Sequence, residues 1–164
     1  MDVDHILQTL ASQKVDYILI GGMNFLLNHR PELTFDVDLW IEDSESNLAR
    51  INSALRELGA EWGRTETQWR PVSTDSRWLK QQSVFCVTSP FGAVDIFREV
   101  RGLEGQYAEC KGRALQRTTG TGVAYTSLSD RDMLACQLAL PEAERKPGRV
   151  ETLLRAIGGK HQPP

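Results

Sequence analysis

A glycine pair at the end of one short apolar run, followed by two aspartates inside a second run, constrains this chain more than any other feature. The first run is Tyr17-Ile-Leu-Ile-Gly21-Gly22, which predicts a buried strand that ends in a tight turn. The second is Thr34–Ile41, whose alternation predicts a half-buried strand. Residues two apart in a strand point to the same side, so we expect Asp36 and Asp38 on one face. The apolar face would carry Phe35, Val37, Leu39 and Ile41, and the acidic face would carry Asp36, Asp38 and Trp40.

Two aspartates inside an apolar strand need a chemical reason. Aspartate is disfavoured in strands, and like charges on one face repel each other. Two other Asp-x-Asp pairs, at residues 2–4 and 130–132, fall at expected helix starts, where acids satisfy free amides and the helix dipole. Asp36 and Asp38 have no such role. We therefore favour a shared divalent metal ion over a solvated strand edge.

The glycine pair lies between an expected strand and an expected helix. Gly21 and Gly22 could expose backbone amides to an anion at the start of that helix, or they could form a plain tight turn. Asn24 and Leu26 occupy positions where a dinucleotide-binding fingerprint has glycine, and no Gly-Lys-Ser/Thr follows as in a P-loop. The pair thus favours phosphate binding of another kind.

The remaining periodicity predicts an α/β (α+β) domain with a mixed sheet and helices packed against it. Asp95 interrupts the apolar run Ala93–Phe97, which a turn at Ser89–Gly92 joins to the preceding strand, and it is the third candidate metal ligand. We expect a single domain over residues 1–158 and a disordered tail over 159–164. The expected helices span 3–14, 23–28, 44–58, 103–115, 129–140 and 150–157, and the expected strands span 15–20, 34–41, 83–88, 93–97 and 123–128.

Composition limits the class of protein. The 164 residues are 40% hydrophobic and 25% charged, as is usual for one globular domain. A net charge of -3 without a dense run of Lys and Arg argues against duplex DNA and favours a small phosphorylated ligand or a protein partner. Three widely spaced cysteines form neither a disulfide framework nor a zinc signature. With no apolar run of about 20 residues and an acidic N-terminus, we expect a cytoplasmic protein without a membrane partner.

The segment from Trp62 to Lys80 has weak periodicity, and two interpretations of it remain open. Aromatic residues interleaved with basic ones can stack a base and pair a phosphate. The same residues can instead form an aromatic cluster that covers the core, with basic groups at its rim. The residues concerned are Trp62, Arg64, Trp69, Arg70, Arg77, Trp78 and Lys80.

Taken in order, the glycine pair, the threonine before the acids, Asp36-x-Asp38 and Asp95 resemble the DNA polymerase β-like nucleotidyltransferase superfamily. The chain is most similar to its small bacterial members, the AbiEii-like proteins, several of which act in toxin–antitoxin or phage-defence systems. The segment from Gly21 to Ile41 carries the resemblance, which extends more loosely to about Ile157. It implies a nucleotidyltransferase fold.

The resemblance also implies an enzyme that moves an NMP from an NTP to a hydroxyl acceptor, with release of pyrophosphate. Asp36, Asp38 and Asp95 would bind two Mg²⁺ ions, and Asp95 would also help to position or deprotonate the attacking hydroxyl. The acceptor would be a small molecule, an RNA end or a protein. The residues expected at the nucleotide are Gly21, Gly22, Thr34 and Arg98.

A second interpretation is a catalytically degenerate module of the same fold that binds a nucleotide or a protein, for example within a toxin–antitoxin pair. Glu32 and Phe35 stand where such proteins have basic residues, and Gln137 stands where a lysine is expected. Lys146 and Arg149 could supply the missing charge, although the intervening Pro-Gly would break the helical register. The three intact aspartates favour the enzyme.

Overall fold

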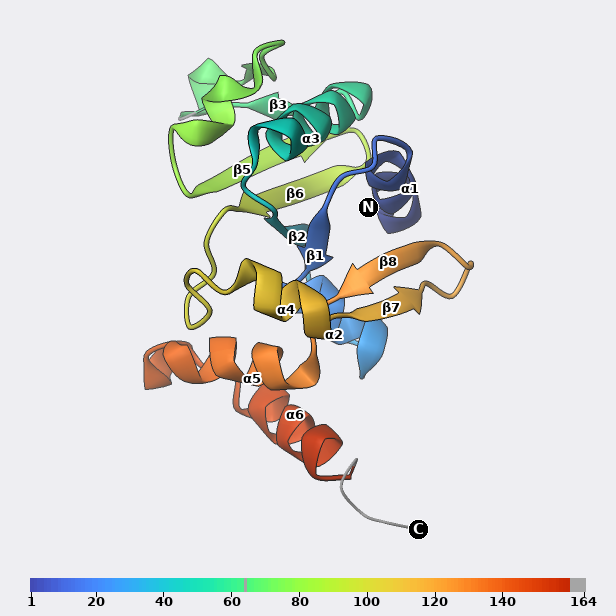
Figure 1. The fold of residues 1–164 in the computed structure, drawn as a ribbon, viewed down its shortest axis with the longest axis vertical. Helices are drawn as coiled ribbons and strands as arrows, with labels where there is room; N and C mark the ends of the chain where they lie inside the picture. The colour runs from blue at the N-terminus through green and yellow to red at the C-terminus, as the bar shows by residue number, and fades with distance from the viewer. Residues whose placement is uncertain (64, 160–164) are drawn as a thin grey trace.

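The structure, a computed structural model, describes residues 1–63 and 65–159, and in that part a mixed eight-stranded sheet is packed against helices (Figure 1). This confirms the expected α/β (α+β) class. The strands are β1 (Tyr17–Leu19), β2 (Asp36–Ile41), β3 (Glu61–Trp62), β4 (Arg70–Pro71), β5 (Val84–Ser89), β6 (Gly92–Phe97), β7 (Leu115–Thr118) and β8 (Ala124–Ser127). The α-helices are α1 (Val3–Ser12), α2 (Gly21–Asn28), α3 (Glu45–Glu57), α4 (Tyr107–Arg113), α5 (Asp130–Ala139) and α6 (Pro147–Gly159). Short 3-10 helices are η1 (Glu66–Gln68), η2 (Ser76–Lys80) and η3 (Glu142–Glu144).

The strand order places the two acid-bearing strands next to each other. It runs β4-β3-β5-β6-β2-β1-β8-β7. β2 pairs antiparallel with β1 and parallel with β6. β5 and β6 form the expected hairpin, closed where Ser89 pairs with Gly92. Parallel pairing of β2 with β6 therefore joins segments that are far apart in the sequence.

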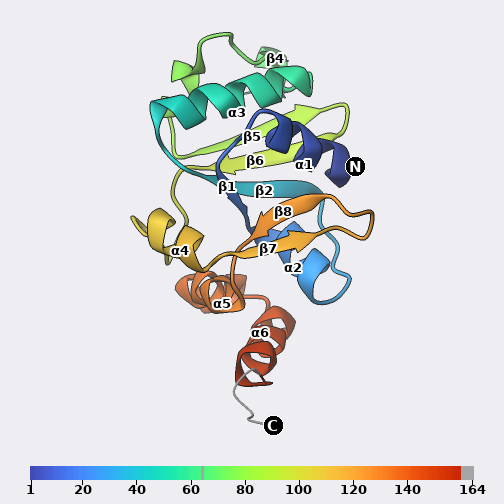
Figure 2. The same cartoon turned by 45° about the vertical axis from the view of Figure 1, so that its right-hand side comes forward.

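Helices cover both faces of the sheet. α1 and α3 lie on one side of it and α4 and α5 on the other, with α6 packed against α5 (Figure 2). Leu10 and Ile51 belong to the first core together with Leu39 of β2. Met133 and Leu153 belong to the second core together with Trp40. Two hydrophobic cores thus hold the central strands from opposite sides.

Burial on both faces corrects one detail of the expected β2. Trp40 lies on the face of the acids, as expected, but it is fully buried in the second core rather than at an open surface. Phe35 was expected on the apolar face, yet it precedes the strand and is 74% exposed. The strand is therefore half-buried only near Asp36 and Asp38.

The region around α4 differs from expectation. A helix was expected over 103–115, but Gly105 adopts a φ of +70°, a left-handed conformation that interrupts a helix, and α4 begins at Tyr107. Leu115, instead of ending the helix, pairs with Ser127 in β7. β7 was not expected because its side chains are mostly exposed at the sheet edge and lack an apolar alternation.

The helix ends agree better with the sequence. The sequence favoured Asp43 or Ser44 as the cap of the helix over 44–58 and Ser129 as the cap of the helix over 129–140. In the structure Ser44 and Ser129 cap α3 and α5, each by accepting a hydrogen bond from the amide three residues later. The Pro-Gly near the C-terminus starts α6, because Pro147 occupies the first helical position, where proline is favoured. Of the tail expected over 159–164, Gly159 ends α6 and residues 160–164 lie outside the described residues. No helix in the described part of the chain is both long and apolar enough to span a bilayer.

Candidate metal centre

The three candidate aspartates meet on one face of the sheet. Asp38 of β2 is the direct partner of Asp95 in β6, so their side chains leave neighbouring strands on the same side. Asp36 lies two residues before Asp38 and shares that face. Each of the three residues offers a carboxylate oxygen within 4.8 Å of those of the other two. The fold thus brings together the three acids that the sequence singles out.

Thr34 fixes the orientation of Asp36. Its hydroxyl donates a hydrogen bond to Oδ1 of Asp36 at 3.0 Å. The same side chain lies against Gly22, where an added Cβ would stand 2.7 Å from the threonine hydroxyl oxygen. Thr34 was expected at the nucleotide, and the structure places it in direct contact with a candidate metal ligand.

The glycine pair lets Asp38 approach the start of α2. Gly21 has a φ of +66°, and a Cβ added to it would lie 1.9 Å from Oδ2 of Asp38, which is closer than any real contact. The Gly22 amide donates a hydrogen bond to the Asp38 carboxylate. The amide at the start of α2 thus faces the Asp38 carboxyl group, and binding of a phosphate by Gly21 and Gly22 stays a prediction.

The electrostatics of the cluster are unfavourable without a cation. Burial, followed by the charges of Asp36 and Asp95, raises the pKa of Asp38 to about 7. Burial and Asp36 also raise the pKa of Asp95, although a hydrogen bond from the Cys86 thiol acts in the opposite direction. A bound cation would therefore stabilise carboxylates that are held together in this way.

A cavity of about 260 Å³ opens beside Asp38 and Gly21. It lies where β1 and β6 meet α5 and α6. Its apolar wall includes Phe97, Val100, Leu128 and Met133. Its polar groups include Arg101, Gln137 and Arg149. Asp38 thus borders a mainly apolar recess that also holds cationic side chains.

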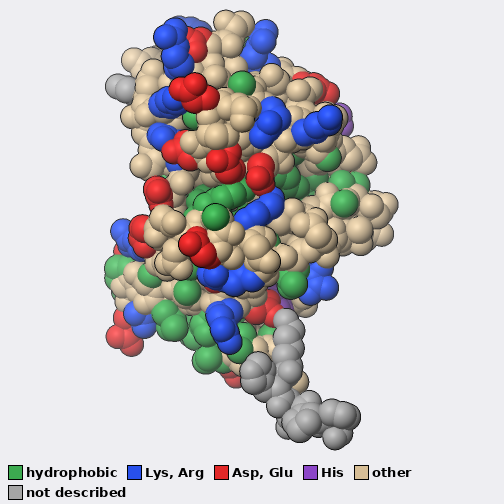
Figure 3. All heavy atoms as spheres, in the orientation of Figure 1, with side chains coloured by type: hydrophobic (Ala, Val, Ile, Leu, Met, Phe, Trp, Pro, Cys, Tyr) green, Lys and Arg blue, Asp and Glu red, His purple; other side chains and the backbone are tan. Residues whose placement is uncertain are grey.

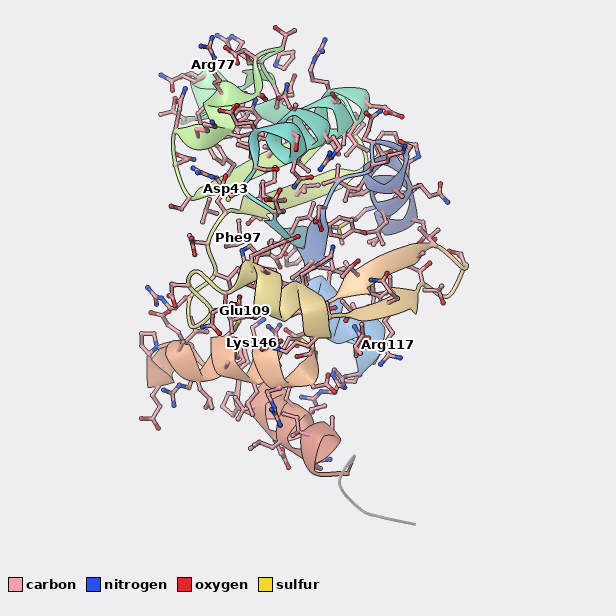
Figure 4. All side chains as sticks on the ribbon, in the orientation of Figure 1. Asp43, Arg77, Phe97, Glu109, Arg117 and Lys146 are labelled. Atoms are coloured by element: carbon pink, nitrogen blue, oxygen red, sulfur yellow. The ribbon has the colours of Figure 1, made fainter. Side chains whose placement is uncertain are left out.

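Arg98, which was expected at the nucleotide, is not brought to the acids. Its guanidinium forms two hydrogen bonds with Asp43, at 2.9 and 2.6 Å, at the other end of β2. It also donates to the carbonyl oxygens of Lys80 and Gln82. Figure 4 shows Asp43 and Lys146 on opposite sides of Phe97. The arginine is therefore occupied by a neighbouring carboxylate away from the metal ligands.

Arg149 is a buried cation that the structure places in this region, beside the same cavity as Arg101. Its side chain is only 8% exposed, and its guanidinium lies over the ring of Phe25, 5.2 Å from the centroid. It borders the same cavity as Asp38. Because α6 begins at Pro147, the Pro-Gly does not break the register as the sequence suggested. That proline was the signal that could have placed Arg149 in the first turn of a helix.

The tryptophans of the segment from 62 to 80 favour the aromatic-cluster interpretation. Trp78 is 7% exposed and packs against Phe85, with ring centroids 4.9 Å apart. Its indole nitrogen donates to Asn52 at 2.7 Å, and Trp62 packs against both rings. The core therefore covers most of the Trp78 ring and leaves little of it for base stacking, although Trp62, Arg70 and Trp78 also line a cavity of about 360 Å³.

The basic residues of that segment do not gather at a common site. Arg77 pairs with Asp75, and Lys80 pairs with Glu45. The expectation for Arg64 lies outside the described residues. On the face shown in Figure 3, the described Lys and Arg side chains are interspersed with Asp and Glu and form no continuous basic stripe.

The donor set suits a hard divalent cation. Three carboxylates offer the oxygen ligands that Mg²⁺ prefers, and their placement leaves positions for water or phosphate oxygens. In comparisons with protein-family models and with curated proteins, no match to this chain was found. The resemblance to nucleotidyltransferases therefore depends on the residues and geometry described above.

Proposed function

We propose that the chain is a Mg²⁺-dependent nucleotidyltransferase related to the DNA polymerase β-like superfamily. It would move an NMP from an NTP to a hydroxyl acceptor and release pyrophosphate. The observation that carries the proposal is the convergence of Asp36, Asp38 and Asp95 from two adjacent parallel strands. Strand aspartates packed against one another in an otherwise apolar sheet have no evident structural role.

Each residue of the cluster has a definite part in this proposal. Asp36, Asp38 and Asp95 would bind the metal, and Thr34 would keep the Asp36 oxygen directed toward it. Bound Mg²⁺ would supply charge for the entering and leaving oxygens of phosphoryl transfer. The glycine at position 21 allows Asp38 to reach the site at all.

The cavity beside Asp38 supports a small organic substrate. Its wall is mainly apolar, which would exclude water from the reacting groups and accept a ring such as a nucleobase. The proposed catalysis consists of positioning and charge stabilisation, and it asks for no covalent bond to the protein.

A second candidate function is a catalytically degenerate module, which could belong to a toxin–antitoxin pair. The observation that favours it is that the expected lysine is missing and that the nearby cationic side chains are already paired with a carboxylate. Gln137 replaces the expected lysine, and its side-chain oxygen accepts a hydrogen bond from the Lys146 amide at 3.1 Å. Glu32 pairs with both Lys146 and Arg149. Such a module would keep nucleotide binding and lack turnover.

Calorimetric titration of each of the four NTPs, with and without Mg²⁺, tests the proposal. The proteins to compare are the wild type, an Asp36→Asn/Asp38→Asn variant and an Asp75→Asn control, whose carboxylate lies on the surface beside Arg77. We expect binding that requires Mg²⁺, disappears in the double variant and persists in the control. If the wild type binds no NTP, the stand-alone enzyme is excluded and a partner protein becomes the next object of search.

A further inference from the structure

Glu32 holds two cations at the edge of the candidate site. Its Oε1 accepts a hydrogen bond from Lys146 Nζ at 2.7 Å and pairs with the Arg149 guanidinium. Arg149 Nε also approaches Oε2 at 3.3 Å. The Glu32 side chain is only 20% exposed. Although burial acts to raise it, the two cations together lower the pKa of Glu32 below its usual value, so the carboxylate is charged.

Arg149 lies close to the residues of the proposed centre. A Cβ built on Gly22 would be 3.7 Å from Nη2 of Arg149. Arg149 shares the cavity with Asp38, and its positive charge acts on the Asp38 carboxyl group. An anionic group bound to Arg149 would therefore lie next to the proposed metal site.

Arg149 is built into the structure as a fixed cation. It is almost fully buried and stacked on Phe25, so little side-chain freedom remains to be lost when it binds an anion. A guanidinium binds a carboxylate and a phosphate with the same fork of donors. The Glu32 carboxylate can therefore occupy the position that a phosphate group would take beside Arg149.

Glu32, by contrast, sits on a segment with few other attachments. It belongs to the irregular connection between α2 and β2. The neighbouring apolar side chains of Leu33 and Phe35 are 76% and 74% exposed, so they do not pack the segment onto the core. Release of Glu32 would consequently disturb little of the hydrophobic core.

We propose that Arg149 and Lys146 form a binding subsite for a phosphate group and that Glu32 occupies this subsite until a phosphorylated ligand displaces it. The identification of the ligand as the polyphosphate of an NTP rests on the proposed function; the exchange of carboxylate for phosphate does not. In the protein without ligand, the Glu32 carboxylate would then compete with phosphate for the subsite and weaken phosphate binding.

The test is calorimetric titration of inorganic pyrophosphate without metal. Glu32→Gln removes the competing charge and retains a side chain of similar shape. If Glu32 closes the subsite more than nine-tenths of the time, its removal should tighten binding at least about tenfold relative to wild type. Arg149→Gln in the Glu32→Gln background should abolish that gain. Glu151→Gln is the matched control, because it frees Arg155 on the same helix outside the cavity, and it should bind as the wild type does.

Pyrophosphate binding by Glu32→Gln that is no tighter than that of wild type would overturn the proposal, as would a gain that survives Arg149→Gln. Thermal melts establish that the variants fold. Should Glu32→Gln fail to fold, Lys146→Gln replaces it, since that side chain is 56% exposed and its loss should weaken pyrophosphate binding several-fold, whereas unchanged binding would contradict the subsite.

Parallel titrations of Mg²⁺–ATP separate this proposal from the broader one. If the subsite exists but the protein is no nucleotidyltransferase, the pyrophosphate results above should hold. The affinity for Mg²⁺–ATP should then be the same in the wild type and in the Asp36→Asn/Asp38→Asn variant. If the protein is a nucleotidyltransferase that lacks this subsite, ATP binding should require Mg²⁺. Its affinity should then be unchanged by Glu32→Gln and by Arg149→Gln.

Discussion

Asp38 and Asp95 face each other across a parallel strand pair, so that two carboxylates begin from adjacent positions on one face of the sheet. Asp36 adds a third, and their oxygens lie within 4.8 Å of one another. Like charges at this separation destabilise the metal-free protein once they ionise. The penalty can be measured through the pH dependence of stability.

Asp38→Asn should stabilise the metal-free protein at pH 8. Burial, Asp36 and Asp95 raise the pKa of Asp38 from 3.8 to about 7. The folded protein thus holds this proton more tightly than the unfolded chain, so its contribution to stability is full below about pH 4 and is lost as the pH rises through 7. The variant should gain about 4 kcal/mol at pH 8. Urea unfolding in EDTA at pH 4 and at pH 8 measures the difference in the free energy of unfolding between variant and wild type.

The same experiment contains its control. At pH 4 the Asp38 carboxyl group is protonated in the folded protein, and the variant and wild type should unfold alike. Saturating Mg²⁺ at pH 8 should stabilise the wild type and leave the variant almost unchanged, because ligand binding stabilises only a protein that binds it. A variant no more stable than wild type at pH 8 would contradict the raised pKa.

The acid cluster could be predicted because its signal is local. Asp36 and Asp38 stand two apart in an apolar strand, and alternation alone places them on one face. Asp95 was a third candidate because it interrupts an apolar run, and the resemblance to a known family grouped it with the pair. The parallel pairing of β2 with β6, which joins distant segments, was not predicted. Arg149 was harder to place, since its position depends on where α6 starts and on its packing against Phe25.

Parts of the fold were hidden for a related reason. β7 is an exposed edge strand, so burial imposes no alternation on its residues. Trp62 belongs to a two-residue strand and Trp78 to a five-residue 3-10 helix, and both elements are too short for periodicity to reveal. Conversely, Ser129 was correctly predicted as a cap, and Ser44 was one of two candidates with Asp43, because a cap depends on contacts within one turn.

Gly21→Ala should prevent metal binding and destabilise the fold. The added methyl group would collide with Oδ2 of Asp38, and the φ of +66° is unfavourable for alanine. Gly105→Ala is the matched control, because Gly105 has a φ of +70° with no atom within 4 Å of an added Cβ. The control should lose about 1–2 kcal/mol from backbone strain alone. Urea unfolding and Mn²⁺ titration measure both effects; equal behaviour of the two variants would show that contact with Asp38 is unimportant.

Thr34→Val should weaken metal binding while preserving the shape of the side chain. It removes the hydroxyl that donates to Asp36 at 3.0 Å, leaving that carboxylate free to rotate. Loss of such an orienting partner typically lowers metal affinity by about ten- to hundredfold. Thr34→Ser retains the hydroxyl and should bind Mn²⁺ nearly as well as wild type. Equal affinity of the valine and serine variants would mean that the hydrogen bond does not position Asp36.

Cys86 provides a chemical reporter of the same charges. Although Cys86 is exposed, desolvation by its neighbours, a hydrogen bond to Asp95 and the nearby carboxylates raise the pKa of its thiol to about 11, so little thiolate forms at pH 8 and alkylation should be slow. Asp95→Asn removes the nearest negative charge and should accelerate iodoacetamide modification of Cys86 by about tenfold for each unit by which the pKa falls. Asp43→Asn, remote from the cluster, should leave the rate unchanged.

Mass spectrometry of the Cys86 peptide distinguishes this reaction from modification elsewhere. Cys110 is buried, and burial raises the pKa of Cys136 to about 12, so both should react more slowly than Cys86 in the wild type. A rate at Cys86 that does not respond to Asp95→Asn would mean that the charge of Asp95 does not raise the pKa of the thiol. A faster rate in that variant, with Cys110 and Cys136 unaffected, would locate the excess negative charge beside Cys86, at the face of the sheet where the aspartates of β2 and β6 are proposed to bind the metal.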